Sequence, residues 1–314
     1  MNPNEVKRAL VIGAGTMGHS IAQVFAQIGI EVNLVDLNEN VLKRAENLVK
    51  SNLETLADFG RVARKQIPSI LKHIRYSTEL KSATDSVDFA IEAVVEVPDV
   101  KREIFRRLDE LCPSGTVLAS NTSSLNVFEI AKIRRLDRLV VAHWFAPPHI
   151  IPLVEVVPGP ETSPETLNFT AKLMERLGKR PVVMKSFVPS FIVNRIQNAI
   201  FATVMVILQQ GWATVEDIDV AVKTSLGIRL PIVGVAQTLD FTGLNLIHDL
   251  IKAGGMPVPA IIEEKVKKGH LGVSTSKGMY DYGGRTEEEI LRKRDELYLK
   301  LLDHLEKIKA FDRV

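Results

Sequence analysis

Residues 9–18 read ALVIGAGTMG, and this stretch decides the fold of the N-terminal half. An apolar, β-branched run over Ala9–Gly13 enters a glycine turn, and apolar residues at helical spacing follow over Ser20–Ile28. In a GxGxxG turn the first glycine permits a tight bend, the second lets the backbone approach a pyrophosphate, and the third allows close helix–strand packing. The helix that follows offers free N–H groups and a partial positive charge to phosphates. The sequence therefore predicts a dinucleotide site at Gly13, Gly15, Thr16, Met17 and Gly18, the alternative being a turn that only packs.

A carboxylate follows the glycine turn at the interval that such a site requires. The next expected strand, Glu31–Asp36, ends in Asp36, roughly twenty residues on, where a carboxylate would accept hydrogen bonds from the adenosine ribose. A 2′-phosphate would meet like charge there, and no arginine follows immediately. NAD is therefore favoured over NADP as the cofactor.

The hydrophobic pattern predicts two domains. Strands are expected at Asp88–Val94, Thr116–Ala119, Arg138–His143, Leu153–Val157 and Arg180–Met184, with helices at Glu39–Phe59, Lys101–Leu111 and Ser163–Leu177. Alternating strands and helices predict a parallel sheet covered on both faces. From Phe187 the pattern is helical, at Pro189–Gln210, Val215–Leu226, Thr242–Ala253, Pro259–Lys268 and Thr286–Lys309, and the first of these is apolar nearly all round, as in a buried central helix. We expect an α/β Rossmann-type domain over residues 1–187 and an all-α domain for substrate binding and dimerisation over residues 188–314.

Composition excludes several classes of protein. A length of 314 residues with 46% hydrophobic and 25% charged residues indicates a globular chain of two domains. A net charge of +2 gives no overall attraction to nucleic acid or membranes, and polar residues interrupt the longest apolar run, so neither partner is expected. The single cysteine, Cys112, fits a reducing compartment, and the N-terminal residues lack a signal-peptide pattern, which favours a cytoplasmic protein. The histidines match no metal-ligand spacing, so no metal site is expected.

The segment 121–157 contains the residues that suggest chemistry. It reads NTSSL at its start and VVAHWFAPPHIIPLVEVV at its end, so that His143 ends one apolar run and Glu155 lies inside the next. An imidazole titrates near neutral pH and suits the transfer of a proton from an alcohol. The alternative is a core histidine and an unrelated glutamate.

Together these segments resemble the L-3-hydroxyacyl-CoA dehydrogenase family over nearly the whole chain. The matching segments are LVIGAGTMGHSIA, EAVVE, SNTSSL, AHWF-P, LVEVV, P-FIVNR and SKGMYDY. The resemblance implies a Rossmann domain, a helical dimerisation domain, a homodimer, and NAD-linked interconversion of a 3-hydroxy and a 3-keto compound.

The resemblance also implies roles for four residues near the expected substrate. His143 would be the general acid/base, and Glu155 would hold its ring and stabilise the imidazolium, like the carboxylate of a triad. Ser123 and Asn194 match residues that contact the substrate in the family. Taken alone, Ser123 would be a helix cap and Asn194 would form a hydrogen bond within its helix.

Other positions match the cofactor site or depart from the family pattern. Glu96 and Lys101 match residues that contact the nicotinamide nucleotide, although alone they would be a strand end and a solvated helix face. Ala146 stands where the family usually has an asparagine, which would cost one hydrogen bond of about 1 kcal/mol. Ser190 replaces a glycine, and Ser274 replaces a lysine that acyl-CoA members often have.

The substrate class stays open between a CoA thioester and a free hydroxy acid. The LGIR segment ending in Arg229 resembles relatives that act on free acids, such as L-gulonate 3-dehydrogenase, and a guanidinium can hold a carboxylate with two bonds. The alternative for Arg229 is a structural ion pair. A basic segment, Arg61, Arg64, Lys65 and Lys72, would meet a CoA phosphate or be a solvated face. A short-chain L-3-hydroxyacyl-CoA is the favoured substrate; a free 3-hydroxy acid and an NAD-binding protein with little catalysis are the alternatives.

Overall fold

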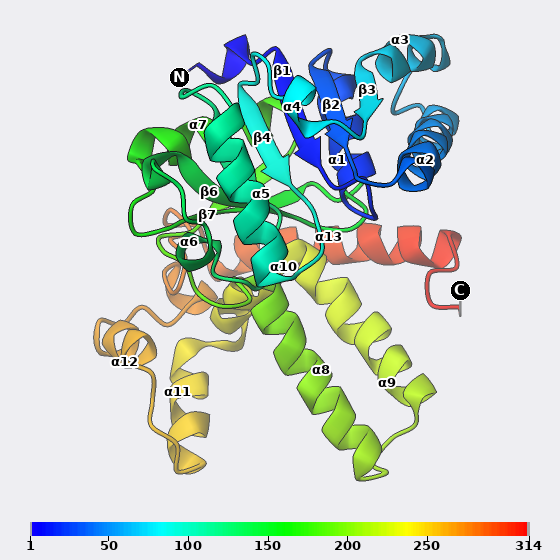
Figure 1. The fold of residues 1–314 in the computed structure, drawn as a ribbon. Coiled ribbons are helices and arrows are strands. Elements are labelled where there is room, and N and C mark those ends of the chain that lie inside the picture. Colours follow the sequence, from blue (N-terminus) through cyan, green and yellow to red (C-terminus); the bar gives the residue numbers. More distant parts are fainter. Residues whose placement is uncertain (1, 313–314) are drawn as a thin grey trace. The chain divides into compact units, whose positions relative to one another are not determined.

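The computed structural model describes residues 2–312 and divides into two compact units, Met1–Ala199 and Ile200–Val314. The first unit contains an eight-stranded sheet in the order β3-β2-β1-β4-β5-β6-β7-β8 (Figure 1). Its strands are β1 (Arg8–Ile12), β2 (Glu31–Val35), β3 (Ile74–Ser77), β4 (Phe89–Glu92), β5 (Val117–Ser120), β6 (Leu139–Trp144), β7 (Leu153–Pro158) and β8 (Arg180–Val183). Its helices are α1 (Gly18–Gln27), α2 (Glu39–Asp58), α3 (Ile67–Lys72), α4 (Leu80–Ala83), α5 (Pro98–Leu111), α6 (Val127–Ile130) and α7 (Pro164–Arg176), and α8 (Val193–Gln209) begins in it.

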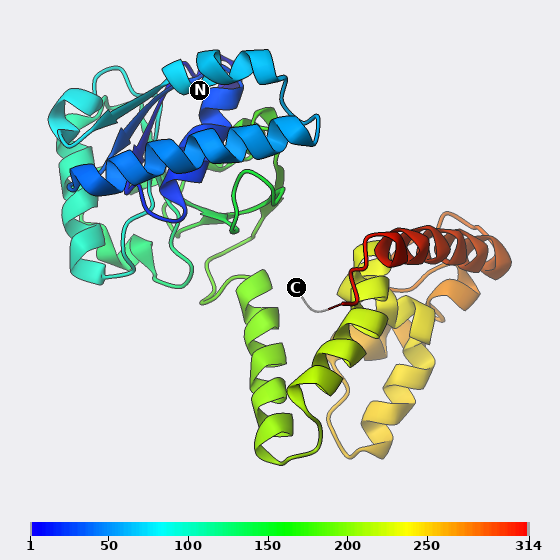
Figure 2. The ribbon, with the colours of Figure 1, turned by 90° about the vertical axis from the view of Figure 1, so that its right-hand side faces the viewer.

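Helices cover the sheet on both faces, because successive side chains of a buried strand point to opposite sides. Ala9 and Val11 of β1 belong to a core cluster that includes residues of α1, α2 and α7. Leu10 and Ile12 belong to the opposite cluster, with residues of α5. Figure 1 shows α5 beside β4, and Figure 2 shows α2 from the side. The predicted fold class, a Rossmann-type α/β domain followed by helices, is confirmed.

Two features of the sheet differ from the prediction. The pair β6–β7 is antiparallel, not parallel, because the eight residues that separate these strands leave no room for a helical crossover. In this pairing His143 lies directly opposite Glu155. The sheet also contains β3, which was not predicted, because the charged Arg75 interrupts the apolar pattern of a four-residue edge strand.

The second unit consists of helices (Figure 2). They are α9 (Val215–Ala221), α10 (Gly227–Thr242), α11 (Leu244–Ala253), α12 (Ala260–Lys267) and α13 (Glu287–Lys307), with a π-helical turn at Val222–Leu226. The sequence pattern did not predict α10, since this helix contains Pro231 and bends at Gly234, whose φ of 66° is not helical. Within residues 2–312, no helix is both long enough and apolar enough to cross a membrane.

The prediction for the long apolar helix is wrong in two respects. Helix α8 begins at Val193, four residues later than expected, and in the single chain none of its residues is buried. Apolar side chains such as Ile196, Phe201 and Met205 are exposed along it. The apolar pattern therefore marks a face that this chain leaves uncovered. The domain boundary at residues 187/188 stays a prediction, and the compact units divide at 199/200.

Candidate active site

The glycine turn lies at the carboxyl end of β1, next to the end of β2. The N–H of Ala14 donates to Oδ2 of Asp36 at 2.8 Å, so the predicted carboxylate lies directly beside the turn. Thr16 is exposed and Met17 half-buried where the turn passes into α1. The parallel pairing of β1 and β2 explains this proximity, because it brings the carboxyl ends of both strands to one edge of the sheet.

The three glycines of the turn meet different constraints. A Cβ on Gly13, whose φ is +93°, would lie 2.6 Å from the carbonyl oxygen of Ala93, and a Cβ on Gly18 would lie 1.7 Å from that of Gly13. Gly15 is exposed, and a Cβ there would meet no atom within 4 Å. Packing therefore requires Gly13 and Gly18, whereas Gly15 leaves open backbone that fits the pyrophosphate of NAD.

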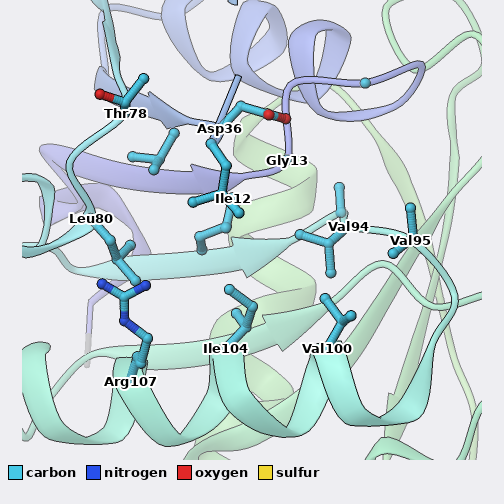
Figure 3. A pocket seen from close by; sticks show the side chains of 14 residues that line it. Ile12, Gly13, Asp36, Thr78, Leu80, Val94, Val95, Val100, Ile104 and Arg107 are labelled. Carbon is cyan, nitrogen blue, oxygen red and sulfur yellow. The ribbon is translucent and has the colours of Figure 1, made fainter. Parts of the chain in front are cut away.

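A cavity of about 290 Å³ opens beside the turn. Figure 3 shows its largely apolar wall, which includes Ile12, Val94 and Ile104, with Asp36 on one side and Arg107 of α5 on another. Such a cleft suits the adenosine half of a dinucleotide, with the base against the apolar wall and the ribose hydroxyls on the carboxylate.

The second group of predicted residues meets across the antiparallel strands β6 and β7. Nδ1 of His143 lies 2.9 Å from Oε2 of Glu155, and both side chains are buried. The ionised carboxylate accepts a hydrogen bond from Nδ1–H, which leaves Nε2 of the ring for proton transfer. The rings of Phe145 and Phe191 lie beside the imidazole, with centroids 4.5 and 5.3 Å away.

Glu155 is also held by the backbone at Ile192 and Val193, for which the sequence pattern predicted no role. Its Oε1 accepts the backbone N–H groups of Ile192 and Val193, both at 3.0 Å, at the start of α8. Burial raises the pKa of Glu155, but the hydrogen bonds from His143 and from these two N–H groups outweigh it and leave the pKa below its ordinary value. The carboxylate is therefore ionised at neutral pH, as the partner of an imidazolium must be.

The turn that supplies these N–H groups is strained. Ser190 and Phe191 have φ values of 65° and 50°, in the left-handed region that favours glycine. In the sequence the segment P-FIVNR indicates only the resemblance to the family. The glycine expected at position 190 was the one signal that would have indicated this turn.

At the end of β4 the structure brings together Glu96, Lys101 and Ser123. Oε1 of Glu96 accepts the N–H of Ser123 at 3.0 Å, and its Oε2 lies 3.1 Å from Nζ of Lys101. Lys101 is buried and donates to Glu92, so its interpretation as part of a solvated helix face is wrong. The interpretation of Ser123 as a helix cap is also wrong, because α6 begins at Val127.

The two remaining candidates lie further along the chain. Asn194 is half-buried in the first turn of α8, beside Val193. Arg229 is exposed on α10 and donates to Oγ of Ser225 at 3.2 Å. Among the described residues no carboxylate forms an ion pair with Arg229, and its role as a substrate anchor or in a structural ion pair stays a prediction. Within the same residues no cluster of three or more histidine, cysteine or acidic side chains could hold a metal ion.

Comparison with known proteins places this site in a family. The sequence profile "3-hydroxyacyl-CoA dehydrogenase, NAD binding domain" matches residues 8–187, and that of the C-terminal domain of the same family matches residues 191–282. The chain belongs to the 3-hydroxyacyl-CoA dehydrogenase family. It is an NAD-dependent dehydrogenase of that family, and the glycine turn and Asp36 lie in the NAD-binding domain.

Relatives of known name support this assignment. A probable 3-hydroxybutyryl-CoA dehydrogenase of Bacillus subtilis is 34% identical over 90% of this chain and 99% of its own. The 5-formyl-3-hydroxy-2-methylpyridine 4-carboxylate 5-dehydrogenase of Mesorhizobium japonicum is 30% identical over 88% of this chain and 91% of its own. The crystal structure of a 3-hydroxyacyl-CoA dehydrogenase from Archaeoglobus fulgidus superposes with a TM-score of 0.80 at 31% identity, covering 95% of this chain and 99% of its own.

Proposed function

We propose that this protein interconverts a short-chain L-3-hydroxyacyl-CoA and the corresponding 3-ketoacyl-CoA, with NAD as the oxidant. The observation that carries the proposal is the buried His143–Glu155 hydrogen bond of 2.9 Å, which commits Nδ1 and leaves Nε2 for the substrate hydroxyl. In the oxidising direction Nε2 takes the hydroxyl proton, and Glu155 stabilises the resulting imidazolium. Bound NAD would supply the acceptor for the hydride that leaves the carbon bearing the hydroxyl.

Other residues of the chain would orient the substrate and the cofactor. Ser123 and Asn194 are short hydrogen-bonding groups that we assign to the substrate oxygens. Glu96 and Lys101 are assigned to the nicotinamide end of the cofactor site, where Lys101 acts through Glu96 rather than by direct contact, because its ammonium is buried between carboxylates. The rings of Phe145 and Phe191 exclude water from one side of the imidazole.

A second cavity of the first unit supports a phosphorylated carrier. It measures about 340 Å³, and its lining includes Arg61, Gln66, His149 and Lys179. Burial lowers the pKa of Lys179 to about 8, and its ammonium donates to backbone carbonyl oxygens, among them that of Ile151 at 3.0 Å. Cationic groups around a cavity of this size suit the phosphates of coenzyme A.

A free 3-hydroxy acid is the second candidate substrate. The Mesorhizobium relative is named for a pyridine carboxylate rather than a CoA thioester. Arg229 has no acidic partner among the described residues and would be available to a substrate carboxylate. We expect Arg229→Met to lower kcat/KM for a free acid more than about tenfold and to spare a thioester; equal losses on both would contradict such an anchor.

The function is tested by measuring NADH formation with L-3-hydroxybutyryl-CoA, L-3-hydroxybutyrate and L-gulonate in parallel. His143→Gln is expected to lose at least about a hundredfold in rate, the lower end for acid/base catalysis, while NAD affinity stays nearly unchanged. His73→Gln is the control. This partly exposed histidine pairs with Glu31, and both residues lie far from His143 along the chain. Wild-type protein that binds NAD but oxidises none of these substrates would favour an NAD-binding protein with little catalysis.

The remaining expectations form part of the same proposal. We assign residues 188–314 to substrate binding and dimerisation, and the active protein to a homodimer. We place it in the cytoplasm and in fatty acid metabolism, as its single cysteine and its 3-hydroxybutyryl-CoA dehydrogenase relative favour.

A further inference from the structure

Three charged side chains form a network at the end of β4. Glu92 is 0% exposed and Lys101 1% exposed. Nζ of Lys101 donates to both carboxylate oxygens of Glu92, at 2.8 and 2.9 Å, and lies 3.1 Å from Oε2 of Glu96. One ammonium is thus shared between two carboxylates. The ionised network carries one net negative charge.

Hydrogen bonds tie this network to the neighbouring strands. The hydroxyl of Ser120 on β5 donates to Glu92, and the N–H of Thr122 donates to Oγ of Ser120 at 3.1 Å. Oδ1 of Asn121 accepts the N–H of Trp144 at 2.9 Å, next to His143 on β6. These hydrogen bonds fix the charged groups of the network relative to β6, which bears His143. A change of side-chain rotamer alone would not move the charges away from that strand.

In the proposed binding mode the nicotinamide lies over this network. Asp36 at the end of β2, beside the glycine turn, would receive the adenosine ribose, and the turn after β1 would receive the pyrophosphate. The next strands along the same edge are β4 and β5, followed by β6 with His143. A dinucleotide that spans this edge and presents its reactive ring to His143 must pass over the ends of β4 and β5.

We infer that the Glu92–Lys101–Glu96 network sets the preference of the site for the oxidised cofactor. The nicotinamide ring is cationic in NAD⁺ and neutral in NADH, so a nearby net negative charge stabilises only the oxidised form. Glu92 controls that charge because it neutralises Lys101. Without Glu92 the ammonium would neutralise Glu96, and the network would carry no net charge. The inference rests on the proposed position of the nicotinamide beside His143.

The test is the ratio of the dissociation constants of NAD⁺ and NADH, measured by fluorescence titration of the full chain. Glu92→Gln is expected to raise the ratio Kd(NAD⁺)/Kd(NADH) about tenfold, because it weakens only the binding of the cationic ring. A merely structural role would weaken both forms equally, and equal factors would overturn the inference. Because binding alone is measured, a chain that turned over no 3-hydroxy substrate would still give a decisive ratio.

Two further variants separate charge from position. Combining Glu92→Gln with Lys101→Met removes the ion pair but restores one net negative charge, so the ratio should return to the wild-type value even if both affinities fall. A ratio that stays raised in this double variant would overturn the inference. If Glu92→Gln fails to fold, Glu96→Gln removes the same charge from a position whose side chain is 35% exposed and must raise the ratio alike. An unchanged ratio would be equally decisive against the inference.

Glu103→Gln is the matched control. Glu103 lies on α5, the helix that also bears Lys101. It is exposed and pairs with Arg106. Its removal changes the charge of the protein by the same amount at a solvent-screened position and is expected to leave the ratio unchanged. A change as large as that of Glu92→Gln would show that overall charge, rather than this network, sets the preference.

Discussion

His143 shows how little of a single residue's chemistry resides in the residue itself. Its Nδ1 is committed to Glu155, and Glu155 is fixed in turn by the N–H groups of Ile192 and Val193. An imidazole without that carboxylate would be free to adopt either tautomer and would lose the partner of its charged form. The reactivity that we assign to His143 therefore depends on three backbone or side-chain groups that lie far from it in sequence.

Glu155→Gln tests this dependence. The amide would donate to Nδ1, fix the wrong tautomer and lower kcat by up to about 10⁴-fold, as in triads that lose their carboxylate. Because the folded-state pKa of Glu155 is lowered, its carboxylate stabilises the fold above its unfolded-state pKa of about 4.3, and this stabilisation is lost as the pH falls through the folded-state value. Urea unfolding should thus show a wild-type advantage over the variant that shrinks below about pH 4; an advantage independent of pH would refute the role of the charge.

Ser190 carries a conformational cost that can be measured. Its φ of 65° lies in the left-handed region, which is unfavourable for a residue with a Cβ but not for glycine. Ser190→Gly is expected to raise the free energy of unfolding by about 0.5–1 kcal/mol, because the gain in the folded state exceeds the added chain entropy. Denaturant unfolding measures it, with Ser186→Gly as a nearby control for the entropy of the unfolded chain. A variant less stable than the wild type would show that the serine side chain makes a compensating contact.

The strand–turn–helix element at residues 8–27 combines a packing requirement with a binding requirement. Gly18 lies against the carbonyl of Gly13, whereas Gly15 faces open space. The first requirement belongs to the folded chain itself, and we propose that the second belongs to the pyrophosphate of NAD.

Alanine at the two glycines should separate these requirements. Gly18→Ala is expected to lower the free energy of unfolding by about 1–3 kcal/mol or more, because the added carbon has no room. Gly15→Ala should change stability by less than about 0.5 kcal/mol, yet weaken NAD binding on the order of tenfold. Thermal unfolding and NAD titration of both variants measure this. Loss of stability in Gly15→Ala with NAD binding intact would reverse the assignment.

For the molecule as a whole, the apolar surface of α8 is the feature that a single chain does not explain. Phe201 is 52% exposed and Met205 60%, one helical turn apart. Exposed apolar side chains gathered on one element mark an interface. The family resemblance implies a homodimer, and we propose that the second copy of the chain covers this helix.

Sedimentation tests the expected homodimer directly. The wild-type chain should be a dimer at micromolar concentration, and Phe201→Glu combined with Met205→Glu should make it a monomer, because charges would be buried without partners. Phe59→Glu is the control, since this aromatic residue is 78% exposed in the first unit and should leave the dimer intact. A stable wild-type monomer would contradict the homodimer.

Much of the fold and of the site could be predicted from local patterns. Short segments of the sequence predict the glycine turn, Asp36 and the alternation of strands and helices. They can do so because turns, caps and periodicities depend on neighbouring residues. The same segments carried the resemblance to the dehydrogenase family. The helix α10 and the strand β3 escaped prediction because Pro231 and Arg75 contradict the local pattern, and tertiary packing overrides it.

The sequence by itself determined the glycine turn with Asp36 after the next strand, the presence of His143 and Glu155 in two successive apolar runs, and the family. Only the tertiary structure decided that β7 runs antiparallel to β6, that Lys101 is buried between two carboxylates, and that the backbone at Ile192 and Val193 holds Glu155. The physical reason is that register, burial and charge pairing depend on groups far apart along the chain. The free energy of a buried charge is set by neighbours that no short segment contains.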